Sequence, residues 1–203
     1  MVENQVNYYE NPLEIENKLW SLLVEAVKNR ESEFRTPVFI CGNKNDLDGR
    51  VIVLRKADKE NRFVQFHSDI RSSKIKKIKE NSNCSILFYG KKDKIQLRLK
   101  VIAEINFKNN ITKESWEKTG HISRKCYLVN NGPGSVSEKP TSGLDSKFDN
   151  FNFTKEQSEE GYKNFCVIKC KIKTIEWLYL AAKGHRRALI NFEASKKFTW
   201  LVP

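Results

Sequence analysis

A short stretch at residues 68–74 combines hydroxyls and cations in a pattern suited to binding a phosphate group. A phosphate monoester needs several hydrogen-bond donors and positive charge at close range, and a helix N-terminus supplies backbone N–H groups with a partial positive charge. The side chains that could complete such a site are Ser68, Arg71, Ser72, Ser73 and Lys74. The alternative is a solvated helix cap with a lysine-rich face, because Lys76, Lys77 and Lys79 follow. By itself the segment leaves both interpretations open.

Two apolar segments nearby carry polar residues that suit a planar ligand. Arg50 and Arg55 bracket four strand-forming residues, and Gln96 stands among the aliphatic residues of a later strand. The amide of Gln96 can both donate and accept hydrogen bonds, as the edge of a nitrogen heterocycle requires. Taken singly, each of these three residues is at least as well explained as a polar residue on the surface.

A third basic segment, Lys183-Gly-His-Arg-Arg187, lies near the end of the sequence. His185 and the two arginines after it could hold an anionic substrate, or they could form an ordinary basic turn. His67 directly follows an apolar strand, and it could contact a ligand or simply be half-buried. The sequence contains no HExxH, P-loop or GxGxxG motif and no recognisable Ser/His/Asp triad, so the chemistries that these motifs mark are not indicated.

The composition is that of one globular domain with a strong positive charge. The 203 residues are 39% hydrophobic and 31% charged, with a formal net charge of +12. This charge favours anionic ligands, phosphates above all, although it also fits nucleic acid or an acidic membrane surface. A nucleic-acid-binding barrel is the least favoured alternative, because the lysines are scattered and no aromatic residues are interleaved with the basic run at 74–79.

Cysteine usage and the N-terminal segment predict a reduced, cytoplasmic setting without a membrane anchor. The five cysteines are odd in number and match no disulfide or zinc spacing. Cys166 and Cys170 share one face of an alternating strand, so we expect packed thiols there and no metal site. Residues 1–16 contain no apolar signal core, and no window reaches the roughly 18 apolar residues of a membrane helix.

The elements that must position these residues are mostly short antiparallel strands. Period-two patterns and turn signals predict strands at 37–41, 51–54, 63–67, 85–89, 95–107, 165–180, 188–192 and 198–202. Hydrophobic spacing and cap residues predict helices at 13–30, 74–80 and 112–129. Short connections between close-set strands indicate a barrel with flanking helices.

The segments without periodicity complete the predicted organisation. Residues 43–49 are rich in turn formers. Residues 130–152 form a long loop, and a loop of this length in a compact domain is usually functional or disordered. We find no internal boundary, so residues 1–203 are predicted to form a single domain, with residues 1–12 as an arm that could be disordered.

Six of these segments, in this order, resemble the pyridoxamine 5′-phosphate oxidase family of FMN-binding split barrels. The matching pieces are Arg50-x4-Arg55, Phe66-x-Ser-Asp-x-Arg-Ser-x-Lys74, Gln96, Ile175-Glu-Trp177, His185-x-Arg187 and Trp200-Leu-Val-Pro203. The resemblance covers about residues 15–203 and is closer to an oxidase-like subgroup than to the biosynthetic oxidase. It implies a mainly β fold, an antiparallel split barrel of Greek-key type with flanking helices.

The resemblance also implies FMN as cofactor and a homodimer whose cofactor sites straddle two subunits. By position, Ser73 and Lys74 would hold the FMN phosphate with help from Arg71 and Ser72, and Gln96 would come from the second subunit. The full set of cofactor residues it implies is Arg50, Val51, Val53, Leu54, Arg55, His67, Ser68, Arg71, Ser72, Ser73, Lys74, Gln96 and Arg187.

The substrate residues that the resemblance implies are Arg55, Tyr127, Lys183 and His185. The expected activity is FMN-dependent oxidation of a small substrate, with hydride transfer to the flavin and reoxidation by dioxygen. The segment Asn131-Gly132-Pro133 lacks an arginine that the biosynthetic oxidase carries before its proline. This departure keeps open a second hypothesis, a flavin-binding sensor or carrier without turnover.

Overall fold

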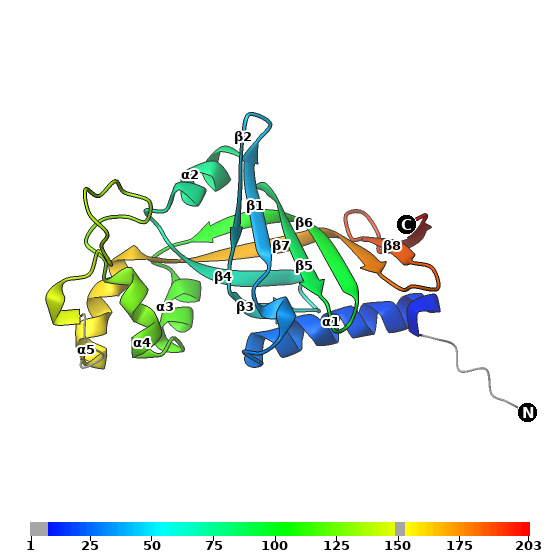
Figure 1. The fold of residues 1–203 in the computed structure, drawn as a ribbon, viewed down its shortest axis with the longest axis horizontal. Coiled ribbons are helices and arrows are strands. Elements are labelled where there is room, and N and C mark those ends of the chain that lie inside the picture. The colour runs from blue at the N-terminus through cyan, green and yellow to red at the C-terminus, as the bar shows by residue number, and fades with distance from the viewer. Residues whose placement is uncertain (1–7, 149–152) are drawn as a thin grey trace, which may run out of the picture.

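The computed structural model describes residues 8–148 and 153–203 and is built around an antiparallel β-sheet (Figure 1). Residues 1–7 of the predicted arm and 149–152 of the predicted loop lie outside the described residues. Among the residues that the structure describes, no helix is long and apolar enough to cross a membrane.

Nine strands of the described chain form one sheet, in which every recorded pairing is antiparallel. The main path runs β2-β1-β5-β6-β7-β4-β3, and β8 and β9 continue from β7. The strands are β1 (Val38–Asn43), β2 (Asp46–Val51), β3 (Leu54–Asp58), β4 (Phe63–Asp69), β5 (Asn83–Gly90), β6 (Ile95–Asn106), β7 (Phe165–Tyr179), β8 (Arg186–Asn191) and β9 (Lys197–Leu201).

Alternation along β6 places apolar side chains in the core and polar ones on the outer face, as the sequence predicts. Leu97, Leu99 and Val101 are buried, whereas Arg98 and Lys100 are exposed. The curved sheet encloses a core in which Phe39 of β1 meets Phe66 of β4, with ring centroids 4.9 Å apart. Strands that are distant in the sequence therefore share one core.

Two helices match their predicted positions. Helix α1 (Pro12–Lys28) begins at Asn11, whose side chain accepts hydrogen bonds from two backbone N–H groups of the first turn. It runs beneath the sheet in Figure 1, and its buried face includes Leu19 and Leu23. Helix α2 (Ser73–Glu80) has Ser72 as its N-cap residue and lies beside the β1–β2 hairpin.

The predicted helix at 112–129 is wrong, because the chain breaks at Gly120. Three short pieces replace it: α3 (Asn110–Glu117), α4 (His121–Arg124) and a 3-10 turn at Lys125–Tyr127. Ile122 and Cys126 are exposed, and Arg124 is buried instead, with its guanidinium 4.5 Å from the ring centroid of Trp116. A further short helix, α5 (Lys155–Ser158), packs against this group.

The predicted strand at 51–54 is also wrong, because the chain changes strands within it. β2 ends at Val51 and β3 begins at Leu54, so the two arginines of this segment belong to different strands. The predicted turn at 43–49 is shorter than expected. The side chain of Asn43 accepts hydrogen bonds from the N–H groups of Asn45 and Asp46, and this local turn lets β2 begin at Asp46.

We expect Gly42→Ala to destabilise the protein by about 1–3 kcal/mol. Gly42 has φ +120°, and an added Cβ would lie 2.1 Å from the backbone carbonyl oxygen of Asp46. The backbone must therefore shift in the hairpin that carries Arg50. Urea unfolding of the variant would measure the loss, with Gly120→Ala as the matched control because nothing lies within 4 Å of a Cβ there. Equal stability of the two variants would contradict this account of the turn.

Candidate functional site

A cluster of hydroxyls and cations forms where α2 begins beside β2. Arg50 of β2 donates to the Oγ atoms of Ser72 and Ser73, at 3.4 and 3.2 Å. Lys74 donates to the Oγ atoms of Ser68 and Ser72, at 2.8 and 3.0 Å. We call these five residues the hydroxyl–cation cluster. The segment 68–74 and Arg50, which the sequence separates by about two strands, are thus brought together.

The hydroxyl–cation cluster has more positive charge and more donors than its own residues satisfy. The Nε atom of Arg50 is buried without a hydrogen-bond partner among the described residues, although Asp48 pairs with the same guanidinium. Burial, and then repulsion from Arg50, lowers the pKa of Lys74. The Ser72 side chain makes no capping bond to α2, because it faces the two cations. An anion with several acceptor oxygens would satisfy these groups.

Arg71 lies next to the cluster in sequence but is engaged elsewhere. Its guanidinium donates to both carboxylate oxygens of Asp69, at 3.0 and 2.7 Å, and to the carbonyl oxygens of Val129 and Asn130. The hydrogen bond to Asp69 is the main reason that the pKa of Arg71 is raised. This side chain ties the start of the long loop to the end of β4, so the structure gives no support to its predicted role at a phosphate.

Gln96 and Arg187 lie in one row across the outer face of the sheet. Gln96 of β6 is opposite Leu178 of β7, which is opposite Arg187 of β8. Side chains in one such row point to the same face. Arg187 also donates to Glu176 at 2.9 Å, and Glu176 pairs in turn with Arg98. The outer face thus carries a small charged network beside Gln96.

This outer-face pair and the hydroxyl–cation cluster lie on opposite faces of the sheet within one chain. Arg50 stands in one row with Phe39, Ile86 and Leu99, which face the core. Gln96 is three residues from Leu99, so its side chain points to the other face. Lys183 and His185 are exposed on the turn between β7 and β8, and their predicted role as substrate residues stays a prediction.

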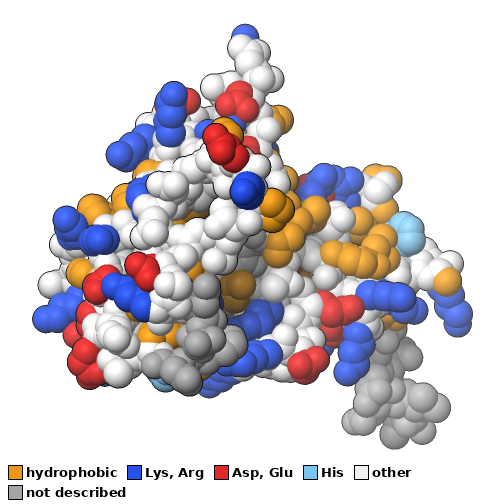
Figure 2. Space-filling view, turned by 60° about the vertical axis from the view of Figure 1, so that its left-hand side comes forward, with side chains coloured by type: hydrophobic (Ala, Val, Ile, Leu, Met, Phe, Trp, Pro, Cys, Tyr) orange, Lys and Arg blue, Asp and Glu red, His pale blue; other side chains and the backbone are white. Residues whose placement is uncertain are grey.

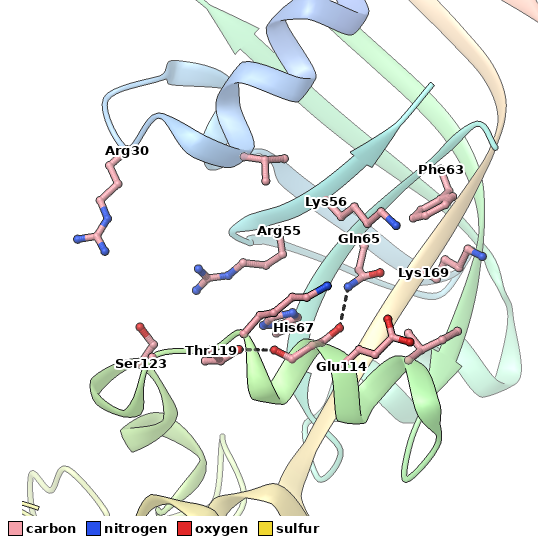
Figure 3. Close-up of a pocket in the computed structure, with 15 residues that line it drawn as sticks. Arg30, Arg55, Lys56, Phe63, Gln65, His67, Glu114, Thr119, Ser123 and Lys169 are labelled. Atoms are coloured by element: carbon pink, nitrogen blue, oxygen red, sulfur yellow. Dashed lines mark hydrogen bonds between the residues drawn. The ribbon is translucent and has the colours of Figure 1, made fainter. Parts of the chain in front are cut away.

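His67 points away from the hydroxyl–cation cluster. Neighbouring residues of a strand face opposite sides, so Ser68 joins the cluster while His67 lies in a second cavity with Arg55 (Figure 3). The His67 ring meets Phe165, with centroids 4.8 Å apart. Burial, and then the charge of Arg55, lowers the pKa of His67 to about 3. The imidazole is therefore neutral at neutral pH.

We expect His67 to make the protein less stable as the pH falls from about 7 toward 3. Its pKa is 6.5 in the unfolded chain and about 3 in the fold, so between these values the unfolded chain binds more protons. At pH 5 this difference in pKa lowers the free energy of unfolding by about 2 kcal/mol. Urea unfolding at pH 7.5 and 5 should therefore show a smaller pH effect in His67→Gln than in the unchanged protein. Equal pH dependence would contradict the neutral, buried state.

Tyr127 is packed inside the protein, whereas the long loop after it lines a cavity. The Tyr127 ring packs against Trp116 and Phe165, with centroids 5.8 and 5.1 Å away, and burial raises its pKa. This placement favours a packing role. The loop after it lines a cavity of about 960 Å³, which Arg55 also borders. The predicted functional loop thus has a cavity against it, and Arg55 connects that cavity to the one that holds His67.

The sequence matches a known family over the segment that builds the hydroxyl–cation cluster. Residues 19–106 match the family described as pyridoxamine 5′-phosphate oxidase, FMN-binding domain. Over this segment the chain is similar to that FMN-binding domain. No curated protein matches the chain. Within the described ranges, no group of three or more His, Cys, Asp or Glu side chains is placed to hold a metal ion.

Two crystal structures share the fold over nearly their whole length. One is a pyridoxamine 5′-phosphate oxidase-related, FMN-binding protein from Nostoc punctiforme PCC 73102, with a TM-score of 0.73, 16% identity, and coverage of 92% of this chain and 96% of that one. The other is PhzG from Burkholderia lata 383 in complex with tetrahydrophenazine-1-carboxylic acid, with a TM-score of 0.71, 16% identity, and coverage of 100% and 99%. The chain therefore has the fold of these proteins, a split barrel.

Proposed function

We propose that the protein binds FMN and acts as an FMN-dependent oxidoreductase on a small substrate. The observation that carries this proposal is the hydroxyl–cation cluster, where the buried Nε of Arg50 lacks a partner among the described residues and Lys74 is held beside it against charge repulsion. A phosphate monoester fits this donor set, and the matching family domain is described as FMN-binding.

Different residues in and around the cluster would bind different parts of the cofactor. Arg50, Ser72, Ser73 and Lys74 would bind its phosphate, and α2 would direct the dipole of its N-terminus at the same group. The segment that joins β2 to β3, at 51–54, would lie along the flavin, because Val51 is exposed and Val53 half-buried. The chemistry that FMN supplies when bound is acceptance of a hydride from the substrate, with reoxidation by dioxygen.

We also propose a homodimer in which each FMN site takes residues from both subunits. Gln96 and Arg187 would reach a cofactor at the cluster from a second chain, because within one chain they lie on the opposite face of the sheet from Arg50. In an isologous dimer, Gln96 and Arg187 of each chain would lie opposite the cluster of the other chain, so the dimer would have two equivalent sites. His185 and Lys183, on the exposed turn beside Arg187, would then border the substrate.

The outer face of the sheet has the character that such an interface requires. Half-buried apolar residues Val38, Leu87 and Leu189 occupy one row with the Arg98–Glu176 pair, across β1, β5, β6, β7 and β8. A groove of about 530 Å³ lies along this face. In Figure 2, apolar side chains gather between the β1–β2 hairpin at the top and the C-terminal strands, and charges of both signs surround them. Such a face suits a copy of the same chain.

A visible absorbance spectrum of the purified protein, recorded again after loading with FMN and removal of the excess, tests the cofactor. A retained flavin spectrum supports the proposal, and a colourless protein that takes up no FMN contradicts it.

A reducing, cytoplasmic setting, which the five free cysteines support, is part of the same proposal.

The loop cavity favours a second candidate function, an FMN-binding module without turnover. The cations that border this cavity are Arg55 and Lys125, and the segment from Asn130 to Ser137 adds none. A substrate with a phosphate group would therefore find no arginine in the segment where the biosynthetic oxidase carries one before its proline. Oxygen consumption by FMN-loaded protein, with pyridoxamine 5′-phosphate as the first substrate offered, separates the two functions, since the module would retain FMN but consume no oxygen.

A further inference from the structure

A second cavity, of about 600 Å³, lies where the C-terminal end of α1 approaches β3, β4 and α3. It is the cavity that holds His67, and none of the five residues of the hydroxyl–cation cluster lines it. Because His67 and Ser68 face opposite sides of β4, this cavity and the cluster lie on opposite faces of that strand. We call it the His67 cavity, and what it binds is a question separate from FMN.

Cations gather at both ends of the His67 cavity. Figure 3 shows Arg30 and Arg55 at one end, and Lys56 and Lys169 at the other beside Phe63. The Nζ atoms of these two lysines lie 5.0 and 4.4 Å from the centroid of the Phe63 ring. The two ends therefore present separate positive groups from different elements of the fold.

Few negative charges balance these cations. Lys118 also lines the cavity, and Glu114 is the one carboxylate among its lining residues. Asp58, which is not a lining residue, pairs with Lys56 at 3.8 Å, so the lysine end is partly balanced. Within the described part of the chain, the side chains of Arg30, Arg55 and Lys118 make no ion pair or hydrogen bond. An isolated surface cation needs no negatively charged partner, because water and salt screen its charge. Here several cations converge on one concave space, where their mutual repulsion is stronger.

Neighbouring groups show that the positive charge of Arg30 and Arg55 is not balanced by a carboxylate. Burial, and then repulsion from Arg55 and Arg30, lowers the pKa of Arg35. Arg55 also contributes to the lowered pKa of His67 on the cavity wall. A bound anion at this end would remove an unfavourable interaction as well as add a favourable one.

The middle of the His67 cavity is polar but uncharged. The side chain of Gln65 is buried there and donates to the hydroxyl of Ser115 at 3.2 Å. Neutral His67 lies beside it, between the two cationic ends in Figure 3. Amide, hydroxyl and neutral imidazole groups can bind a ligand's uncharged polar atoms without adding charge.

We propose that the His67 cavity binds a small organic dianion whose two negative groups are separated by an uncharged middle. One group meets Arg30 and Arg55, the other meets Lys56 and Lys169, and the middle lies against Gln65 and His67. None of the five cluster residues lines this cavity, so we expect the ligand to bind with or without FMN.

An NMR titration with linear acids tests the proposal on the full chain. The probes are adipate, which carries two carboxylates, and hexanoate, which has the same chain length and one carboxylate. We expect adipate to bind at least about 10-fold more tightly, since the second carboxylate gains charge-assisted bonds. The shifted signals should be those of Gln65, Ser115 and their neighbours.

Paired variants locate the site. Lys56→Met with Lys169→Met keeps apolar stems over Phe63 and should weaken adipate at least about 10-fold while leaving hexanoate nearly unchanged. The matched control is Lys76→Met with Lys79→Met, which removes two exposed charges from α2. It should leave the affinities for adipate and for hexanoate unchanged. The proposal is overturned if hexanoate binds as tightly as adipate, if the control weakens adipate equally, if the signals of Ser72 to Lys74 shift instead, or if neither acid binds.

Discussion

Replacing Arg50 and Lys74 together by Met is expected to lower the affinity for FMN by about 10²–10⁴-fold. Each side chain would donate a charge-assisted hydrogen bond to the phosphate, and such bonds contribute about 1.5–3 kcal/mol each. Both cations are already held within 3.4 Å of the same Ser72 hydroxyl, so little reorganisation is needed before the phosphate binds. Quenching of flavin fluorescence on titration with the protein measures the change.

The controls separate this effect from unfolding and from general charge. Lys76→Met removes a cation from the exposed side of α2 and should leave FMN affinity within about two-fold, because exposed charges interact weakly. The double variant should stay folded without FMN, since burial and Arg50 already disfavour the charge of Lys74. A folded double variant that binds FMN as tightly as the unchanged protein would remove the hydroxyl–cation cluster from consideration as the phosphate site.

Local spacing predicted the part of the cluster at residues 68–74 because its geometry is local. Ser72 and Lys74 belong to one helix start, so their positions in the sequence already bring them together. The alternation at 95–107 similarly fixed which side chains face the core of β6, because a strand with period two has no other way to bury its apolar residues.

The structure departs from the sequence where distant segments decide the outcome. Nothing near Arg71 in the sequence shows that the carbonyl groups of Val129 and Asn130 lie within its reach, and its role at a phosphate stays a prediction. The helix predicted at 112–129 failed for a related reason, since burial of Arg124 against Trp116 and Glu159 outweighs the apolar periodicity of the segment. Tertiary contacts here override local propensity.

The His67 cavity was not visible in the sequence as a site. Its cations come from the segment after α1, from β3 and β7 and from the end of α3. Arg55 was predicted to bind cofactor or substrate, and the others appeared as scattered lysines or arginines. One signal was available: strand geometry places His67 and Ser68 on opposite faces, so one ligand could not contact both side chains from the same side of β4. The resemblance assigned both His67 and Ser68 to the flavin, although their side chains face opposite sides of β4.

Mixing two defective chains is expected to restore FMN binding that neither shows alone. One chain carries Arg50→Met with Lys74→Met and lacks the cluster. The other carries Gln96→Ala with Arg187→Met and lacks the outer-face pair. In a mixed dimer, the cluster of the second chain meets the outer face of the first, so one of the two sites is intact. Random assortment makes half of the dimers mixed, and bound FMN should reach about a quarter of the unmutated level.

The mixture distinguishes a shared site from one that a single chain completes. If each chain built its whole site, a mixed dimer would contain no intact one, and co-expression would add no FMN beyond the two separate variants. Leu189→Asp provides an independent check, because it places a charge in the apolar row of the outer face. It should yield a monomer that keeps its cluster and loses FMN. A monomer that retains FMN would show that Gln96 and Arg187 serve the fold alone.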